Sequence, residues 1–215
     1  MSRVRQHVNP LNNRYSTPVT PPPWADVYAK PQQPLHIDIG SAKGYFISDM
    51  AQACPDWNFL GLEIREPLVQ QCLRQRNELG LTNMHALFCN ANNSLKPLLA
   101  SLPQPPQRVS IQFPDPWFKT RHQKRRVVQP QLTNDLAEYM PVGAWVWLQS
   151  DVESVADDMV EVFSANAQFK RFLEPPQPRT TGLWLASNPL AAPTDRERVT
   201  LAQGKPVYRA LFIKT

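Results

Sequence analysis

An aspartate enclosed by two prolines and followed by two aromatic residues is the part of this sequence best suited to chemistry. The segment PDPWFK spans residues 114–119 and directly follows the apolar run RVSIQF. Because proline fixes φ and lacks an N–H, the backbone is restricted on both sides of Asp115. A carboxylate held beside Trp117 suits a flat heterocycle, which it can bind through hydrogen bonds while the indole stacks. We expect Asp115 to be catalytic; a loop without function is the alternative.

A second carboxylate, Asp38, precedes a glycine turn. The turn has Gly40 and Gly44 with Ala42 between them, whereas a turn that admits a pyrophosphate needs three glycines. Asp38 would repel a pyrophosphate but suits a ligand that carries an ammonium and a sulfonium. This D-x-G-x-x-x-G pattern resembles the first motif of class I methyltransferases. A tight strand-to-helix turn capped by an aspartate is the alternative.

Two further polar residues end predicted strands. Glu63 ends NFLGLE, 25 residues after Asp38, where an acid can accept hydrogen bonds from both hydroxyls of an adenosine ribose. A solvent-facing glutamate before the helix that Pro67 starts is the other interpretation. Asn90 follows NMHALFC, and its amide can donate to and accept from adenine, or it can simply turn the chain.

Positive charge is concentrated just after Asp115. Five of the 23 Lys and Arg residues fall within eight positions: Lys119, Arg121, Lys124, Arg125 and Arg126. The formal charge of +5 and the pI near 9.3 suit a polyanionic partner, although solvated surfaces often carry such a charge. Because this basic run lies next to the proposed active site, we expect it to hold RNA phosphates; a solvated loop is the alternative.

Short β-rich runs alternate with helical patterns from residue 35 onward. The predicted strands are LHIDI, NFLGLEI, NMHALFC, RVSIQF and AWVWLQS. The predicted helices are YFISDMAQA, PLVQQCLRQRNELG, SLKPLLASL, QLTNDLAEYM and SVADDMVEVFSANA. This alternation indicates a mostly parallel, twisted α/β sheet with helices on both faces. After an irregular excursion at 175–193, VYRALFI predicts an antiparallel last strand that closes the sheet.

Composition sets the remaining expectations. Residues 1–34 carry seven of the 23 prolines and predict an extended Pro-rich arm without regular elements, followed by one domain at 35–215. A mean hydropathy of −0.42 and the absence of a long apolar run or secretory signal predict a cytoplasmic protein without a membrane span. The spacing of the Cys and His residues supports no metal site. Composition leaves open whether the protein is a monomer or a homodimer.

Taken together, these segments resemble one family. FPDPWFK followed by RHQKRRVVQP is similar to the motif of the bacterial tRNA (guanine-N7)-methyltransferases, which have the Rossmann-like class I methyltransferase fold. Agreement extends over nearly the whole chain, through RVRQHVNPL, NFLGLEI, LTN at 81–83, SDVE at 150–153, TDRE at 194–197 and GKPVYR at 204–209. The family usually has a more glycine-rich turn around Ala42, often Glu in place of Asp38, and Asp in place of Asn90.

The resemblance implies an enzyme that transfers a methyl group from S-adenosylmethionine to N7 of a tRNA guanine, at position 46 of the variable loop. The implied cofactor-binding residues are Asp38, Gly40, Gly44, Glu63, Asn90 and Asp115, of which Asp115 is also the catalytic acid. The implied RNA contacts are Lys119, Asp151, Thr194, Asp195, Arg196 and Glu197, to which the basic run adds Arg121, Lys124, Arg125 and Arg126.

The chemistry of guanine N7 fits a single acid. N7 carries a lone pair and no proton, so its methylation needs no general base but does place positive charge on the purine. Asp115 can position the base and offset that charge by accepting hydrogen bonds from guanine N1–H and the exocyclic amine. An RNA methyltransferase acting on exocyclic amines is one alternative, because a related D/N-P-P-Y/W motif serves that reaction. A non-catalytic RNA-binding subunit with the same fold is the other.

Overall fold

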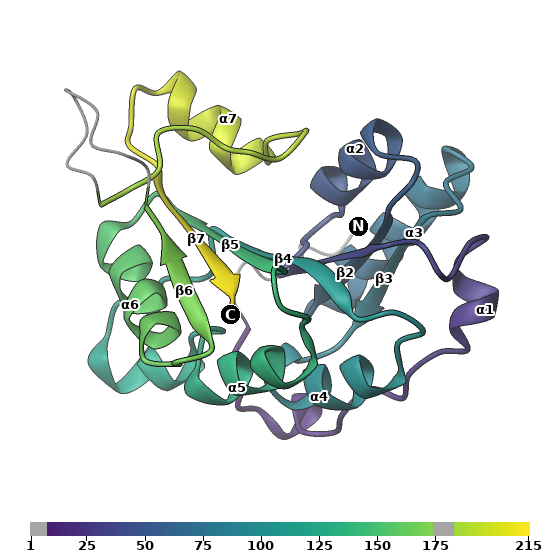
Figure 1. The fold of residues 1–215 in the computed structure, drawn as a ribbon, viewed down its shortest axis with the longest axis horizontal. Coiled ribbons are helices and arrows are strands. Elements are labelled where there is room, and N and C mark those ends of the chain that lie inside the picture. The colour runs from purple at the N-terminus through teal and green to yellow at the C-terminus, as the bar shows by residue number, and fades with distance from the viewer. Residues whose placement is uncertain (1–7, 174–182) are drawn as a thin grey trace.

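A seven-stranded sheet runs through the middle of the computed structural model, which describes residues 8–173 and 183–215 (Figure 1). The strands are β1 (Leu35–Ile39), β2 (Asn58–Glu63), β3 (Met84–Phe88), β4 (Pro106–Gln112), β5 (Trp145–Ser150), β6 (Phe169–Phe172) and β7 (Tyr208–Lys214). Their order in the sheet is β3-β2-β1-β4-β5-β7-β6. Strands β1 to β5 are parallel, and β7 pairs antiparallel with both β5 and β6. The predicted mostly parallel sheet with an antiparallel last strand is confirmed.

The strand order reverses beside β1, which pairs with β2 on one side and β4 on the other. Asp38 therefore lies opposite Gly61 on β2 and Ser110 on β4. Connections leave such a point in opposite directions, which opens a crevice at the carboxyl ends of the strands where α/β proteins bind ligands. The topology thus brings the ends of β1, β2 and β4 to one place.

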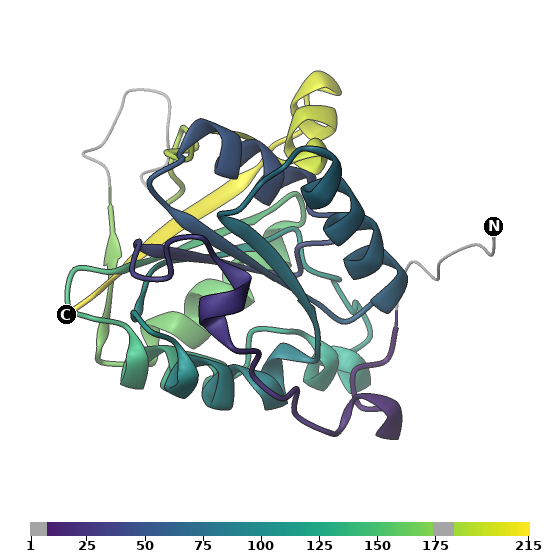
Figure 2. The same ribbon diagram turned by 90° about the vertical axis from the view of Figure 1, so that its right-hand side faces the viewer.

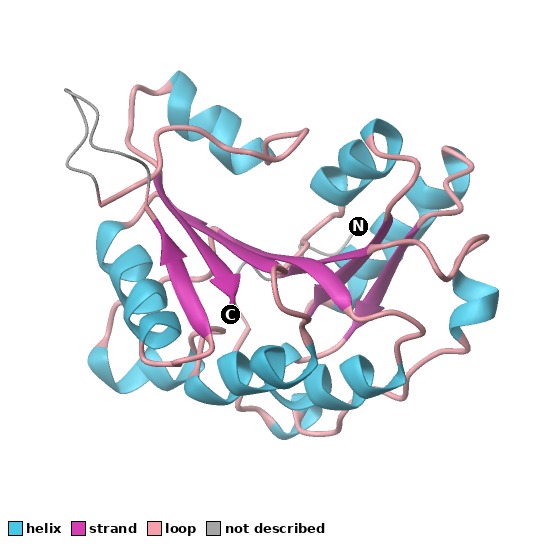
Figure 3. Ribbon diagram, in the orientation of Figure 1, coloured by secondary structure: helices cyan, strands magenta, loops and turns pink. Residues whose placement is uncertain are grey.

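Helices cover both faces of the sheet (Figures 1 and 3). On one face, α4 (Ala91–Ser101), α5 (Pro130–Tyr139) and α6 (Glu153–Ser164) enclose an apolar core that includes Ile37 and Ile39 of β1. On the other, α2 (Tyr45–Ala53) and α3 (Glu66–Glu78) enclose a second core. His36 of β1 points toward this second face, where its ring contacts Phe46 and Phe59. Successive residues of β1 alternate in this way because strand side chains point to opposite faces.

The N-terminal segment corrects one expectation. We predicted no regular element in residues 1–34, but 3₁₀-helix η1 (Asn13–Tyr15) and the one-turn helix α1 (Trp24–Val27) both lie there (Figure 2). Trp24 is buried, and its indole N–H donates to Ser101 Oγ at 3.0 Å. This side chain fixes the segment to the domain, while the neighbouring prolines keep the helix short. The part of the predicted arm at 1–7, which includes most of RVRQHVNPL, lies outside the described residues.

Two elements in the last third are also absent from the sequence prediction. These are β6, which adds an edge strand beyond β7, and α7 (Asp195–Ala202), which begins just after the predicted excursion at 175–193. The part of that excursion at 175–182 lies outside the described residues. Among the residues that the structure does describe, no helix has the length and apolar character needed to cross a membrane.

Candidate active site

One pocket lies at the carboxyl ends of β1 to β4. Its wall includes four residues predicted for the cofactor site: Gly40, Glu63, Asn90 and Asp115. Trp117 and Arg125 line it as well, and the N-terminal segment contributes Val8 and Pro10. The four predicted residues, which lie up to 75 positions apart in the sequence, therefore meet because parallel strands end at the same edge of the sheet.

The glycine turn after β1 has left-handed backbone at three positions. The φ angles are 90° at Gly40, 49° at Ala42 and 77° at Gly44. A Cβ on Gly40 would meet no atom within 4 Å, so the backbone borders open space there. A Cβ on Gly44 would lie 2.2 Å from Cys72 Sγ, so this glycine lets α2 begin close to α3. Gly40 therefore belongs to the pocket, whereas Gly44 serves packing outside its wall.

Asp38 is buried and is not part of the pocket wall. Its Oδ1 accepts hydrogen bonds from Ser110 Oγ at 2.6 Å and from Gln112 Nε2 at 3.1 Å. Burial raises the pKa of Asp38 to about 6, although both hydrogen bonds act to lower it. Gln112 does line the pocket, so it connects this buried carboxyl to the site.

Glu63 lies in the pocket wall with all of its acceptor positions in use. Its carboxylate accepts from the Ala42 N–H at 2.8 Å, from the Arg65 N–H at 2.9 Å, and from Arg65 Nε and a second guanidinium nitrogen at 2.8 and 3.1 Å. A carboxylate has about four acceptor positions, and the Arg65 guanidinium fills two of them. Hydroxyl groups of a ribose could bind Glu63 by replacing the two bonds from the Arg65 side chain, which can move without a change in the backbone.

Arg65 is a charged pocket residue that the sequence interpretation missed. Burial works against its charge, but the hydrogen bonds and charge of Glu63 and the nearby Asp115 outweigh that effect and raise the guanidinium pKa above its ordinary value. The signal in the sequence was a cation two residues after a strand-ending acid, in the segment GLEIR. Arg65 thus lies within the electrostatic reach of both carboxylates expected to contact ligands.

Asn90 caps a helix and fastens the N-terminal segment. Its Oδ1 accepts from the Asn92 N–H at 3.2 Å at the start of α4, and its Nδ2 donates to the Pro10 carbonyl at 3.1 Å. The geometry therefore includes the role left open as an alternative, in which Asn90 turns the chain. Asn90 nevertheless lines the pocket, and through it the N-terminal segment becomes part of the wall.

The loop that carries Asp115 is held in an unusual backbone conformation. Phe113 and Trp117 have φ angles of 49° and 42°, a region that non-glycine residues adopt only when the surroundings enforce it. The Phe113 N–H donates to the Gln149 carbonyl of β5 at 2.7 Å, and the Pro116 carbonyl accepts from Arg126 Nε at 2.9 Å. These bonds and the two prolines fix the loop on both sides of Asp115.

The basic run divides into structural and exposed residues. Arg126 is largely buried and forms an ion pair with Asp158 of α6, in addition to its bond to Pro116. Arg125 lies over the Trp117 ring, 5.0 Å from its centre, and lines the pocket. The exposed members are Lys119, Arg121 and Lys124, the last two on 3₁₀-helix η2 (Thr120–Arg125). Arg126 thus anchors the loop, whereas the exposed cations face solvent.

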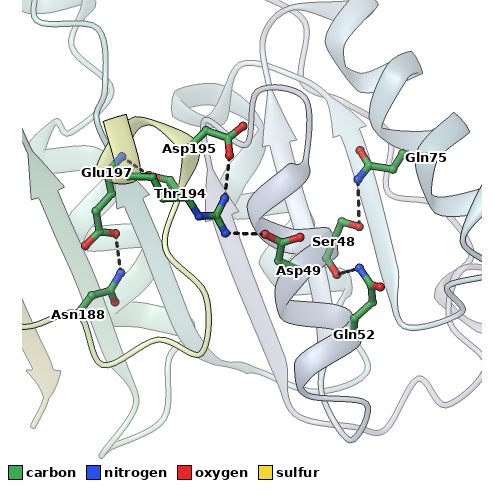
Figure 4. Close-up of polar contacts among 9 residues, drawn as sticks. Ser48, Asp49, Gln52, Gln75, Asn188, Thr194, Asp195 and Glu197 are labelled. Atoms are coloured by element: carbon green, nitrogen blue, oxygen red, sulfur yellow. Dashed lines mark hydrogen bonds and ion pairs between the residues drawn. The ribbon is translucent and has the colours of Figure 1, made fainter. Parts of the chain in front are cut away.

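The predicted substrate residues at 194–197 begin α7 and are tied to the rest of the protein (Figure 4). Thr194 caps the helix, since its Oγ1 accepts from the Glu197 N–H at 3.1 Å. Asp195 pairs with Arg198 at 2.8 Å, and Arg198 also reaches Asp49 of α2 at 3.0 Å. These ion pairs join α7 to α2 on the same face of the sheet.

Arg196 and Asp151 form an ion pair with each other across the end of β5. The side chain of Arg196 is 61% exposed, whereas that of Asp151 is 14% exposed. Strand β5 neighbours β4, and Gln149 lies opposite Gln112 in the register. The structure therefore brings Asp151 and the exposed Arg196 guanidinium to the sheet edge where Asp115 also lies.

Glu197 is 2% exposed and belongs to a buried polar chain. Its carboxylate accepts from Arg209 on β7 at 2.8 Å, from Gln149 at 3.1 Å and from Asn188 at 2.8 Å. Gln149 also donates to Gln112 at 2.8 Å, and Gln112 donates to Asp38. These buried hydrogen bonds connect α7 to the first strand, and the contact of Glu197 with RNA stays a prediction.

The chain resembles proteins of known function. A family model described as "Putative methyltransferase" matches residues 32–210. The chain is 59% identical over 211 residues to a "tRNA (guanine-N(7)-)-methyltransferase" of Trichormus variabilis, covering 98% of this chain and 95% of that one. A protein of the same name from Synechococcus elongatus is 54% identical over 213 residues, with 99% and 96% covered.

Solved structures share the fold. The aminoglycoside resistance methyltransferase NpmB1 matches with a TM-score of 0.56 at 15% identity, covering 88% of this chain and 89% of that one. Precorrin-6y C5,15-methyltransferase from Geobacter metallireducens matches with a TM-score of 0.54 at 12% identity, covering 88% and 87%. The predicted Rossmann-like methyltransferase fold is confirmed by this likeness and by the sheet topology.

Proposed function

The chain belongs to the tRNA (guanine-N7)-methyltransferase family, and we propose that the pocket at the ends of β1 to β4 holds S-adenosylmethionine beside the guanine that it methylates. The enzyme transfers a methyl group to N7 of a guanine in tRNA. We assign its target to position 46 of the variable loop and its working place to the cytoplasm. The observation that carries the proposal is the meeting of Gly40, Glu63 and Asp115 in one pocket.

The residues present fit this cofactor. The open, left-handed turn at Gly40 lets a ligand approach the backbone, and the Glu63 carboxylate can accept the two ribose hydroxyls once the Arg65 guanidinium moves. The pKa of Asp38 is raised to about 6, so this carboxyl is mainly ionised at neutral pH. Its negative charge lies next to Gln112 of the pocket wall and favours a cationic ligand. When bound, the cofactor supplies a methyl group on a sulfonium.

Asp115 is the group that acts on guanine. Its carboxylate can accept from guanine N1–H and the exocyclic amine, which become more acidic as positive charge develops on the ring. The strained, bonded loop holds Asp115 in place before the substrate arrives, so little reorganisation is needed at the moment of reaction. No proton has to leave N7, and accordingly no general base is required.

Family membership also separates the alternatives. Methylation of an exocyclic amine does not agree with relatives named for guanine N7, and a non-catalytic subunit does not agree with a chain that matches catalytic relatives over 98% of its length. Methylation by the purified protein of unmodified tRNA, followed by identification of the methylated nucleoside, tests the reaction directly. A product other than 7-methylguanosine would refute the proposed function.

The role of Asp115 is tested by Asp115→Asn, which keeps the shape but removes the charge. We expect single-turnover methylation to slow by about a hundred- to a thousandfold, as when one preorganised electrostatic group is lost, with cofactor affinity nearly unchanged. Asp56→Asn, an exposed acid outside the pocket wall, is the matched control and should react at the wild-type rate. A folded Asp115→Asn variant with wild-type turnover would remove Asp115 from the mechanism.

A further inference from the structure

Phe118 is an exposed aromatic side chain at the edge of the proposed active site. Its exposed fraction is 71%, and among the large apolar side chains that the structure describes only Val142 is more exposed, at 77%. The preceding residue, Trp117, lines the pocket. Neighbouring residues thus offer one ring to the pocket, where an indole can stack on a flat heterocycle, and one ring to solvent, for which the proposed function gives no role.

The backbone that carries Phe118 is fixed. The loop is bonded to β5 through the Phe113 N–H and to Arg126 through the Pro116 carbonyl, and Arg126 is paired with Asp158. The Trp117 ring packs edge-on against His122, with 5.8 Å between ring centres. An aromatic ring exposed on a loop held this firmly is presented to solvent before any partner binds, which lowers the entropy lost on binding.

The surroundings of Phe118 are cationic. Lys119, Arg121 and Lys124 are exposed within six positions, and the sequence has no acidic residue from 116 to 134. Exposed aromatic rings among cations are the usual means by which proteins bind single-stranded nucleic acid, since the rings stack on bases and the cations hold phosphates. A protein partner would need a larger apolar surface than this single ring.

From this arrangement we infer that Phe118 stacks on a nucleobase next to the target guanine in the same strand. The inference rests on the proposed function, because it takes the guanine to occupy the pocket beside Trp117. A base that enters a pocket leaves the stack of its neighbours, and the neighbouring base then gains a new aromatic surface in Phe118. Lys119 and Lys124 can neutralise the phosphates that link the two nucleotides.

Binding of unmodified tRNA to three variants tests the inference. Phe118→Ala should weaken binding about five- to a hundredfold, as expected for one lost base stack, whereas Phe118→Trp should bind like the wild type. Phe118→Leu keeps an apolar side chain but no planar ring, and it should bind like Phe118→Ala. Because none of these changes removes a charge, the salt dependence of binding should stay as in the wild type. Val142→Ala, the matched exposed control, should leave binding unchanged.

A fluorescent base analogue gives a signature that a structural role would not produce. With 2-aminopurine placed on either side of the target guanine, the wild type should quench the fluorescence of one of the two positions, and Phe118→Ala should not. Wild-type affinity in Phe118→Leu, or unchanged quenching in Phe118→Ala, would overturn the inference. If the wild type forms 7-methylguanosine while these variants bind normally, only the inference fails; if it forms none, the proposed function fails.

Discussion

Removal of the cation from the buried Glu197–Arg209 pair should destabilise the protein markedly. Glu197 and Arg209 are 2% and 6% exposed, so Arg209→Met would leave the Glu197 carboxylate buried without its charged partner. Breaking a buried pair in this way costs about 3–5 kcal/mol. Gln149 and Asn188 still donate to the carboxylate, which places the expected loss near the lower end, about 3 kcal/mol. At ~2–4 °C per kcal/mol for a domain of this size, Tm should fall by roughly 6–12 °C.

A double-mutant cycle in urea isolates the pair. Glu197→Gln alone leaves the Arg209 guanidinium buried beside a neutral amide and should also destabilise the protein. The double variant has no buried charge at this place, so it should recover at least ~1.5 kcal/mol relative to the sum of the single changes. Arg209→Met within about 0.5 kcal/mol of wild type, or strictly additive single changes, would refute the claim that the two charges depend on each other.

Four further results are expected. Glu63→Ala should weaken cofactor binding by about tenfold in calorimetry, near the low end for bonds to a charged group, because the ribose only replaces bonds already made by a guanidinium; unchanged affinity would show that the cofactor lies elsewhere. Lys124→Ala should lower the salt slope of tRNA binding by about 0.7–0.9, whereas Arg126→Ala should lower Tm because it breaks the pair with Asp158. The folded-state pKa of Asp38, about 6, exceeds its ordinary 3.8. Folding therefore binds a proton between these values, and the free energy of unfolding contributed by Asp38 should fall as pH rises from about 4 to 6, a slope that Asp38→Asn should abolish.

The strands could be predicted because burial leaves a pattern in the sequence. β1 and β2 are buried at every position and are read as short apolar runs. β6 could not be found in this way, since its four residues FKRF place two adjacent cations between two aromatic rings at the edge of the sheet and form neither an apolar run nor a period-two alternation. α7 has almost no apolar stripe, and its place depends on the buried Glu197–Arg209 pair and the Thr194 cap. Such contacts between distant residues leave no periodicity.

The sequence could predict which strand ends form the site, but not which side chains bond to each other there. Gly40, Glu63, Asn90 and Asp115 line one pocket because topology alone brings strand ends together. The sequence does not reveal that the Arg65 side chain donates to Glu63 or that Asn90 donates to the Pro10 carbonyl, because these bonds depend on which groups meet in three dimensions. Proximity in the sequence likewise failed to show that Arg126, among five neighbouring cations, faces an acid on α6.

The place of β7 has a consequence for how the chain is made. β7 lies between β5 and β6, although both of these precede it in the sequence. While the chain is synthesised, β5 therefore has an unpaired edge and β6 has no neighbour until residues 208–214 emerge. Such an edge can pair with another nascent chain. The late arrival of β7 therefore makes the interval before it appears a stage at which this protein is exposed to aggregation and at which a chaperone would protect it.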